Sequence, residues 1–532
     1  MKKKTLLLFL VMLAFSIASV SSAGQSDSSA PAADENAPLV IAIEPDYFTF
    51  DPGYAYELYA PMVIGVVYDN LFQVIPSSDA PVPQLAKSYK VSDSGLVYTF
   101  TLRQDAKFTS GNPVMAKDVK FSFDRALNLQ SNASALMDGI VSVDVVDDYT
   151  VSITIAKADS AFVSKTTSTA FAVLDSVVIM AQGGVSDSSA PTADKAQTYL
   201  DHQSAGSGPY ILQSFTADDK LILVRNENYW GDLPEFKTII IQDMPDENAQ
   251  LLAVKGGDID IAFNLSSDQL SQLDGSDVQV ISGSTMTMGF LMMNNNPAIG
   301  KQVSDANVQK AIRYAVDYQG LQTLIGAGTV TPESFIQVGF MGSKDPINTS
   351  TQNNLKKAKD FLSKSAYPDG FSIDFTVCDL APEGIPLTLI AEKIKSDLEK
   401  IGISINIVQD TWGGGFGDAY REGTVGFTAM YWGPDYYDPN TQLAFLPGQY
   451  VGLRAGWTGD MNPDLAGMYD KIVAEADLKT RTKMIKDVVT ETGADSPFIV
   501  YAQYPKYIAA SSALKGVNYS NLYRLDLAAV TK

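Results

Sequence analysis

Side chains that commonly carry chemistry are scarce in this sequence, apart from carboxylates. Among its 532 residues, His202 is the single histidine and Cys378 the single cysteine. No disulfide can therefore form within the chain, and a zinc site of cysteine and histidine ligands is excluded. A nucleophilic triad would have to use His202, for which a surface or packing role is favoured. We accordingly expect no catalytic residue, no metal site and no cofactor.

Carboxylates are abundant, with 61 aspartate and glutamate residues. A pair of them could act as general acid and base, as in glycosidases, although no spacing singles out such a pair. Asp435 lies in the segment Trp432–Pro439 (WGPDYYDP), whose turn-forming residues predict a loop. Taken alone, Asp435 is best interpreted as an acceptor of backbone N–H groups within that turn.

The overall composition excludes several classes of protein. Lysine and arginine number 39 against the 61 acids, which gives a formal charge of −22, and 45% of the residues are apolar. So much apolar surface can bury a sizeable core, which excludes intrinsic disorder. An acidic balance argues against nucleic acid as a partner, because phosphates attract basic residues. It also favours a soluble monomer, because like-charged molecules repel one another.

The N-terminal segment, residues 1–23, has the pattern of a secretory signal peptide. Three lysines precede an apolar run over residues 6–20, and small residues suited to cleavage occupy positions 21–23. The run is short for a membrane span, so a retained anchor is the less favoured alternative. Residues 24–38 are small, polar and acidic, which is typical of a flexible tether.

Cleavage at this point would leave an exported protein without a lipid anchor. Loss of the three lysines takes the formal charge from −22 to −25, and no cysteine lies near the cleavage site to receive a lipid. We therefore expect a soluble protein in a periplasm that is closed by an outer membrane.

Two repeating patterns predict the secondary structure of a mixed α/β fold with more than one lobe. Residues 96–103 and 151–155 alternate apolar and polar side chains, as half-buried strands do. Apolar residues at helical spacing predict helices over residues 119–127, 308–315, 387–401 and 484–489.

One of these helices lies between two predicted strands. Residues 371–375 and 403–407 are apolar alternating runs on either side of the helix over 387–401, which ends at Gly402. A strand, a helix and a strand with a crossover of this length predict a βαβ unit on a partly parallel sheet.

Several motifs are distributed over the chain from about Leu39 to the C-terminus. The longest is Pro83–Arg125 (PQLAKSYKVSDSGLVYTFTLRQDAKFTSGNPVMAKDVKFSFDR). The shorter ones are Gly206–Tyr210 (GSGPY), Arg225–Gly231 (RNENYWG), Gly257–Asp260 (GDID), Val308–Asp317 (VQKAIRYAVD), Tyr367–Phe371 (YPDGF) and Trp432–Pro439. In content and order they resemble the extracytoplasmic solute-binding proteins of peptide-type ABC importers, the oligopeptide-, dipeptide- and nickel-binding family (family 5).

This resemblance implies an α/β fold with two lobes, the type II periplasmic-binding-protein fold. The ligand cleft lies between the lobes, which close on the ligand. The first lobe is discontinuous and carries an extra subdomain. Mapped onto this chain, lobe I comprises residues 39–70, 205–280 and 505–532, the extra subdomain residues 71–204, and lobe II residues 281–504.

The resemblance also implies a ligand site around Asp435. In peptide-binding members, an aspartate just after a tryptophan pairs with the α-amino group of the peptide, and Asp435 matches it. An ammonium group that loses its water when the lobes close needs such a carboxylate. Tyr431 and Gly433 would offer backbone groups to the peptide, and Trp432 would wall a side-chain pocket.

The partner of the ligand carboxylate is not assigned by the resemblance. Some oligopeptide-binding members carry an arginine shortly before the tryptophan, but the stretch here is Thr428–Tyr431 (TAMY), without a cation. Arg421 and Arg454 are the nearest alternatives. Tyr436 and Trp412 are further candidates for the site, supported only by their proximity in the sequence. Peptide length, and even a peptide as the ligand, therefore stay open.

The function implied is that of a binding protein without enzymatic activity. It would capture a solute, most simply a short peptide, and deliver it to the membrane permease of an ABC importer. Related proteins bind nickel chelates, sugars, haem or opine-like compounds on the same scaffold, so a non-peptide ligand is the alternative. A secreted hydrolase with a carboxylate pair is the rival from another class, and a ligand sensor that docks on a receptor would have a similar sequence.

Overall fold

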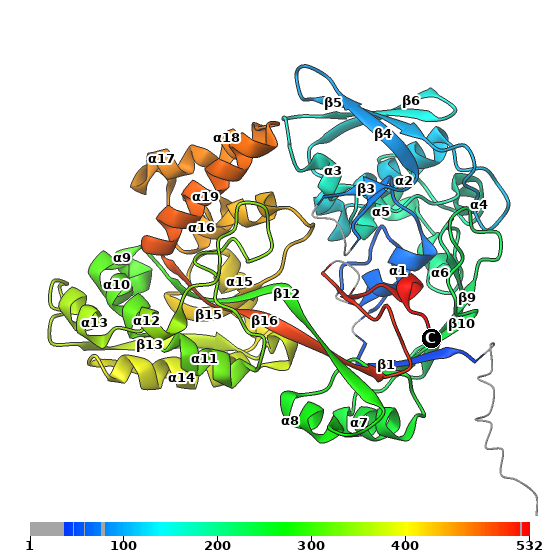
Figure 1. Cartoon of the computed structure of the whole chain (residues 1–532). Coiled ribbons are helices and arrows are strands. Elements are labelled where there is room, and N and C mark those ends of the chain that lie inside the picture. The colour runs from blue at the N-terminus through cyan, green and yellow to red at the C-terminus, as the bar shows by residue number, and fades with distance from the viewer. Residues whose placement is uncertain (1–36, 46, 58, 76–79, 522–523) are drawn as a thin grey trace, which may run out of the picture. The chain divides into compact units, whose positions relative to one another are not determined.

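The computed structural model describes residues 37–532, with the exception of residues 46, 58, 76–79 and 522–523. Ten strands form one mixed sheet (Figure 1). In sheet order they are β14 (Ile403–Asp410), β13 (Phe371–Cys378), β15 (Phe427–Trp432), β12 (Val278–Met293), β16 (Phe498–Ser511), β11 (Ile261–Ala262), β1 (Leu39–Ile43), β10 (Thr238–Asp243), β9 (Lys220–Arg225) and β8 (Tyr210–Thr216).

The predicted βαβ unit lies at one end of this sheet. β13 and β14 pair in parallel from Phe371 with Ile403 to Cys378 with Asp410. The helix between them is α14 (Leu387–Glu399), whose apolar stripe is buried. The chain turns into β14 at Gly402, whose φ of +90° favours glycine. The prediction of a parallel strand–helix–strand unit is confirmed.

We call the part of the protein built around β13, β14, β15 and the adjoining ends of β12 and β16 the second lobe. Its apolar residues form one core, which includes Phe290, Phe375 and Phe427. The helices on this lobe are α9 (Pro297–Gly300), α10 (Ala306–Ala315), α11 (Tyr318–Ile325), α12 (Thr349–Gln352), α13 (Leu355–Leu362), α14, α15 (Phe416–Arg421), α16 (Tyr450–Arg454), α17 (Pro463–Ala466), α18 (Met468–Ala474) and α19 (Leu478–Ala494).

We call the part built around β1 and β8 to β11 the first lobe. β1 lies between β10 and β11 and is parallel to both. A core separate from that of the second lobe includes Ile41, Tyr210 and Ile239. Further elements of this lobe are α1 (Ala60–Val67), α7 (Glu247–Gly256), α8 (Ser267–Leu270) and the hairpin of β17 (Tyr519–Ser520) with β18 (Arg524–Leu525).

β12 and β16 run through both lobes as one antiparallel pair. Val278 pairs with Ser511 in the first lobe, and Met292 pairs with Phe498 in the second. The register of the pairing shifts after Ser284. The irregularity lies on the stretch where the two strands pass from one lobe to the other (Figure 1).

A second sheet of four strands forms a subdomain with its own core. In order, its strands are β4 (Ala86–Val91), β5 (Val97–Leu102), β7 (Thr150–Ile155) and β6 (Ile140–Asp147). Helix α2 (Ala116–Asn128) packs on this sheet. Tyr98 and Phe100 of the predicted strand and Val119 and Phe123 of the predicted helix are all buried there. Short elements nearby are β2 (Phe72–Gln73), β3 (Val82–Pro83), α3 (Phe162–Lys165), α4 (Ser176–Ala181), α5 (Ala190–Ala193) and α6 (Gln197–Leu200).

The boundaries predicted for the lobes and the subdomain remain predictions, residue by residue. The predicted signal peptide over residues 1–23 and nearly all of the predicted tether over residues 24–38 lie outside the described residues. Within the described ranges, no helix is long and apolar enough to cross a membrane.

A buried ion cluster joins the subdomain to the first lobe. Arg125 of α2 donates hydrogen bonds of 2.8 and 2.7 Å to the two carboxylate oxygens of Asp51. The same guanidinium donates bonds of 2.8 and 2.9 Å to Asp194. None of the three side chains is more than 1% exposed. Because Asp51 precedes α1 and Asp194 follows α5, this one cation holds three segments together.

Replacing Arg125 by methionine should lower the free energy of unfolding by about 3–5 kcal/mol, because two buried carboxylates lose their cation. The exposed pair of Lys483 and Asp487 on α19 provides a control. Lys483→Met should change the free energy by less than about 1 kcal/mol. Urea unfolding measures both values, and equal effects would contradict the role given to Arg125.

Candidate functional site

The segment after β15 lies where the two lobes face each other. β15 pairs with β12 as far as Trp432, which lies opposite Met288. Beyond this pair the chain leaves the sheet through Gly433. A Cβ atom at Gly433 would meet no other atom within 4 Å, so this position borders open space.

The two aspartates of the segment have different surroundings. Asp438 binds Arg481 of α19 through both carboxylate oxygens and accepts a hydrogen bond from the backbone N–H of Asn440. The side chains of Asp438 and Arg481 are both buried. Asp438 therefore anchors the loop to the second lobe, whereas Asp435 faces the space between the lobes.

Asp435 has a hydrogen-bond donor from the opposite lobe but no cation. The hydroxyl of Tyr56, in the first lobe, donates a bond of 2.7 Å to its carboxylate. No basic side chain in the described part of the chain forms an ion pair with it. Burial raises the pKa of Asp435 above the usual range, and the bond from Tyr56 only partly offsets this effect. A carboxylate that has lost water without gaining a cation is suited to bind a positively charged group of a ligand.

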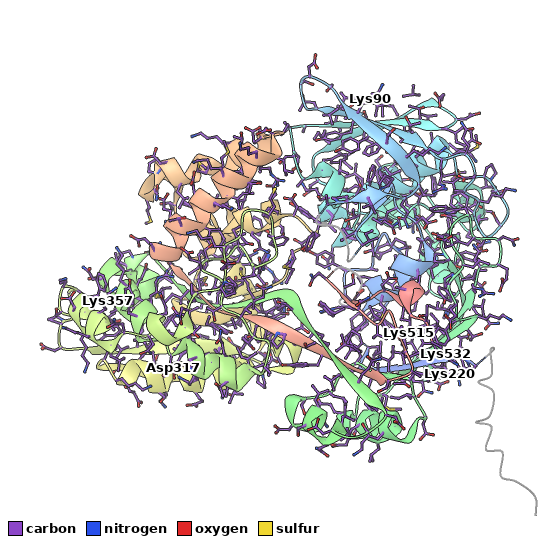
Figure 2. The ribbon with its side chains drawn as sticks, viewed as in Figure 1. Lys90, Lys220, Asp317, Lys357, Lys515 and Lys532 are labelled. Carbon is purple, nitrogen blue, oxygen red and sulfur yellow. The ribbon has the colours of Figure 1, made fainter. Side chains whose placement is uncertain are left out.

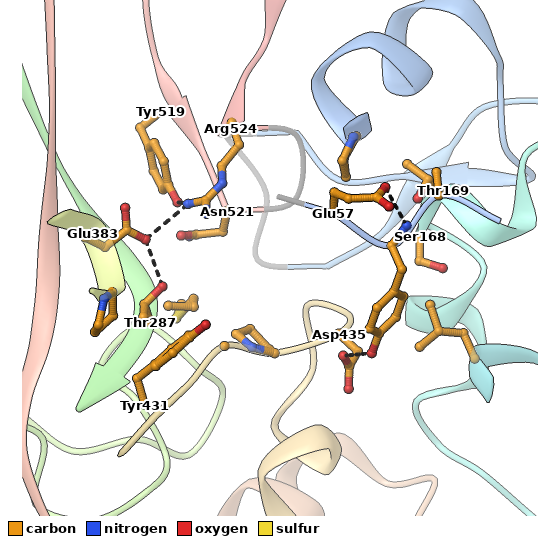
Figure 3. A pocket seen from close by; sticks show the side chains of 18 of the residues that line it. Glu57, Ser168, Thr169, Thr287, Glu383, Tyr431, Asp435, Tyr519, Asn521 and Arg524 are labelled. Atoms are coloured by element: carbon orange, nitrogen blue, oxygen red, sulfur yellow. Dashed lines mark hydrogen bonds and ion pairs between the residues drawn. The ribbon is translucent and has the colours of Figure 1, made fainter. Parts of the chain in front are cut away.

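Asp435 lines a cavity of about 430 Å³ between the lobes (Figure 3). This volume lies within the range of pockets that enclose small molecules. One side of the lining comes from the first lobe and its subdomain: Ala55, Tyr56, Glu57, Pro61, Leu136, Ser168, Thr169, Tyr519, Asn521 and Arg524. The other side comes from the second lobe and the strand β12: Met286, Thr287, Leu380, Ala381, Pro382, Glu383, Tyr431, Gly433, Pro434 and Asp435.

Charged groups lie at two opposite sides of this cavity. In Figure 3, Glu57 and Asp435 lie on one side, and Glu383 and Arg524 on the other. Glu383 accepts hydrogen bonds from Thr287 (3.0 Å) and from Arg524 (3.2 Å). The ammonium nitrogen of Lys506 is 3.8 Å from the carboxylate of Glu383.

The charge of Glu383 is stabilised by these neighbours. Its burial acts to raise the pKa, but Arg524 and Lys506 outweigh that effect and hold the pKa of Glu383 below the usual range. Glu383 belongs to the second lobe and Arg524 to the first. Their ion pair therefore crosses the cleft, as the bond between Tyr56 and Asp435 does.

The subdomain also touches the second lobe. The backbone N–H of Ser160 donates a hydrogen bond of 2.8 Å to the carbonyl of Val473 in α18. The side chain of Asn440 donates a bond of 3.3 Å to Asp159. The two lobes are thus in contact at several points around the cavity, which is the arrangement of a closed cleft.

The structure brings some of the predicted site residues together. Asp435, Tyr431 and Gly433 line the cavity between the lobes. Trp432 and Tyr436 line an adjacent cavity of about 460 Å³, which Asp435 borders as well. The functional roles predicted for these five residues remain predictions.

Three other candidates lie elsewhere. Trp412, Arg421 and Arg454 line neither of these two cavities. Arg421 forms a surface ion pair with Asp418 and lies over the ring of Trp412. Arg454 lies over the rings of Tyr420, Tyr450 and Trp432, at 4.9, 5.4 and 5.9 Å from their centres. The last two of these rings line the cavity adjacent to Asp435.

Sequence reasoning missed most of the polar residues that line the cavity. Tyr56, Glu57 and Arg524 lie outside the motifs, and no local pattern distinguishes them. Glu383 lies between Pro382 and Gly384, a combination that indicates a turn but not a site. Their common feature is their position in three dimensions.

The cysteine and the histidine both lie outside the cavity. Cys378 is buried, and His202 is exposed, in agreement with its predicted surface or packing role. In the parts of the chain that are described, no group of three or more histidine, cysteine, aspartate or glutamate side chains is placed to hold a metal ion.

Substitution of the two aspartates should change the stability of the empty protein in opposite directions. Asp438→Asn leaves the buried Arg481 without its carboxylate and should lower the free energy of unfolding by about 3–5 kcal/mol. Asp435→Asn should leave it unchanged or raise it at neutral pH. A carboxyl group whose pKa is raised by folding costs stability above that pKa and regains it as the pH falls, so the amide removes this cost.

Thermal unfolding at neutral and mildly acidic pH measures both effects. As the pH falls through the raised pKa of Asp435, the wild type should gain stability relative to Asp435→Asn, so that the difference between the two proteins becomes smaller. A marked loss of stability in Asp435→Asn would show that this carboxylate holds the loop instead of facing a ligand.

The sequence of the chain is similar to those of known binding proteins. A family model described as bacterial extracellular solute-binding proteins, family 5, middle part, matches residues 80–451. The probable D,D-dipeptide-binding periplasmic protein DdpA of Escherichia coli is 26% identical over 485 residues, which cover 90% of each chain. The heme-binding protein A of Haemophilus influenzae is 26% identical over 473 residues, 85% of this chain and 84% of that protein.

Among solved structures, the periplasmic binding protein DppA of Helicobacter pylori, in complex with the peptide STSA, superimposes with a TM-score of 0.71. The match covers 92% of this chain and 98% of that one, at 22% identity. This likeness confirms the predicted α/β fold with two lobes.

Proposed function

We propose that this chain, which belongs to the bacterial extracellular solute-binding proteins of family 5, captures a short peptide between its lobes and delivers it to the permease of an ABC importer. The observation that carries the proposal is Asp435, a carboxylate without a cation in a small cavity between the lobes. The free ammonium group of a peptide is the complement that this carboxylate lacks.

The physical basis is the cost of desolvation on both sides. An ammonium group enclosed by closing lobes loses water and is expensive to bury alone. Asp435 is already partly shielded from water, so pairing with an ammonium group compensates part of the desolvation cost of both charges. The hydroxyl of Tyr56 fixes the carboxylate from the opposite lobe, so the site is complete only when the lobes are together.

The residues around Asp435 suit the rest of a peptide. We assign Tyr431 and Gly433 to contacts with the peptide backbone, because they line the cavity at the end of a strand. Trp432 and Tyr436 wall the adjacent cavity together with Tyr450. This cavity would receive a side chain of the peptide, whereas the backbone contacts of Tyr431 and Gly433 would not depend on side-chain identity.

Peptide binding also agrees with the curated relatives, one of which is named for a dipeptide. Another is named for heme, but the histidine available here, His202, does not line the cavity. Capture and delivery need no catalytic group, so we propose that the protein is not an enzyme. We further propose a monomer without a nucleic-acid partner, because the chain carries 61 acids against 39 basic residues. A location in the periplasm agrees with the relative named as a periplasmic protein.

Thermal unfolding in the presence of peptides tests the proposal. Di- to pentapeptides with a free amino group should stabilise the protein, by about 2.7 kcal/mol at 100 times the dissociation constant. N-acetylated peptides should not, because acetylation removes the positive charge. In Asp435→Asn the difference between free and acetylated peptides should disappear.

Asp418→Asn is the matched control, since Asp418 is an exposed aspartate of the same lobe, and it should respond like the wild type. Equal stabilisation by free and acetylated peptides would refute the role of Asp435. Stabilisation by nickel–histidine, a sugar or haem, with no response to any peptide, would refute the peptide and leave the fold assignment intact.

A further inference from the structure

One of the described residues that line the cavity between the lobes has a basic side chain. Of the described residues that line it, Arg524 alone carries a positive charge. Arg524 lies in β18, near the C-terminus, and its guanidinium reaches the side of the cavity opposite Asp435 (Figure 3). A carboxylate of a ligand in this cavity would therefore meet Arg524.

The guanidinium is held in place through one of its nitrogens. Nη1 of Arg524 donates hydrogen bonds to Glu383 (3.2 Å) and to the hydroxyl of Tyr519 (2.7 Å). Its Nη2 and Nε atoms have no hydrogen-bond partner among the described residues. A guanidinium presents its N–H groups in a planar fork that matches the two oxygens of a carboxylate. The N–H groups of Nη2 and Nε are thus available to donate hydrogen bonds to an anion.

The local charge balance also allows an anion. Glu383 is accompanied by two cations, Arg524 and Lys506. This cluster of three side chains has one positive charge in excess. Lys506 lies on the far side of the pair, next to Glu247 in another cavity, so the positive group that faces the ligand is Arg524.

The same ion pair forms a wall. A further cavity of about 450 Å³ lies beyond it, and Ala381, Glu383 and Arg524 line both spaces. A ligand that extended from the first cavity into the second would have to separate the pair. The pair therefore limits the length of a ligand whose amino end is at Asp435.

Both members of the pair have an unusual backbone conformation. Glu383 has a φ of +49° and Arg524 a φ of +61°, and five non-glycine residues of the described chain have positive φ. Residues other than glycine rarely adopt this left-handed region, and they do so where the surrounding structure imposes it. Two such residues meet in one contact across the cleft, which suggests that their position there is required.

We infer that Arg524, positioned by Glu383 and Tyr519, binds the carboxylate of the ligand and closes that end of the cavity. The protein then selects short peptides, of roughly two or three residues in a cavity of this size, that have both a free amino and a free carboxyl end. This inference rests on the proposed function and adds to it the second charged anchor and the limit on length.

Isothermal titration calorimetry with alanine peptides of two to five residues, as free acids and as C-terminal amides, tests the inference. In the wild type, amidation should weaken binding by about 10–100-fold, the effect of losing charge-assisted hydrogen bonds. Binding should also weaken from three residues to four and five. In Arg524→Gln the acid and the amide should bind equally.

Two further variants keep the result interpretable. Arg225→Gln, at an arginine of the first lobe outside the cavity, is the matched control and should discriminate like the wild type. Glu383→Ala/Arg524→Ala removes both members of the pair together, so that neither of the two is left without the other if Arg524→Gln does not fold. This double variant should lose the discrimination and should also accept longer peptides.

Several results would overturn the inference. The first is that peptide amides bind the wild type as tightly as the free acids. The second is that Arg524→Gln still distinguishes acids from amides whereas Arg454→Gln does not. Equal binding of di- and pentapeptides would remove the limit on length. If N-acetylation abolishes binding while amidation has no effect, the inference fails and the proposed function stands. If no peptide binds at all, both fail.

Discussion

A carboxylate that is partly removed from water, with no cation paired to it among the described residues, is the constraint on which this cleft depends. In the described part of the chain, the hydroxyl of Tyr56 is the hydrogen-bond donor that supports the charge of Asp435. The nearby Asp438, in contrast, is compensated by Arg481. One loop thus holds an aspartate whose ion pair fixes it and another that faces the cavity, and we propose that a positively charged group of the ligand pairs with the second.

This charge lies at the boundary between two separately packed lobes. The lobes have separate cores, and β12 and β16 form a continuous ladder between them with an irregular stretch in the middle. The contacts across the cleft include two polar pairs of side chains. Tyr56 with Asp435, and Arg524 with Glu383, join side chains from opposite lobes. Such contacts form only when the lobes meet, so ligand recognition and closure involve the same side chains.

The sequence predicted the repeating elements well and the cavity poorly. The βαβ unit of β13, α14 and β14 and the core around Phe100 follow from hydrophobic periodicity, which acts locally. Asp435 was predicted only through a resemblance, since its loop has the composition of an ordinary turn. Arg524 and Glu383 are far apart in the chain and belong to no motif, so nothing local could bring them together. Their pairing is a property of the folded lobes.

The most direct test of the account is the number of protons exchanged when a dipeptide binds. Calorimetric titrations at mildly acidic pH, in buffers of different ionisation enthalpy, measure this number. Because the pKa of Asp435 is raised in the empty cleft, an ammonium group that binds there should lower it and release protons, and the release should be absent in Asp435→Asn. Binding without proton release, or with the same release in wild type and Asp435→Asn, would contradict the assignment of Asp435 as the receptor of the ligand's charge.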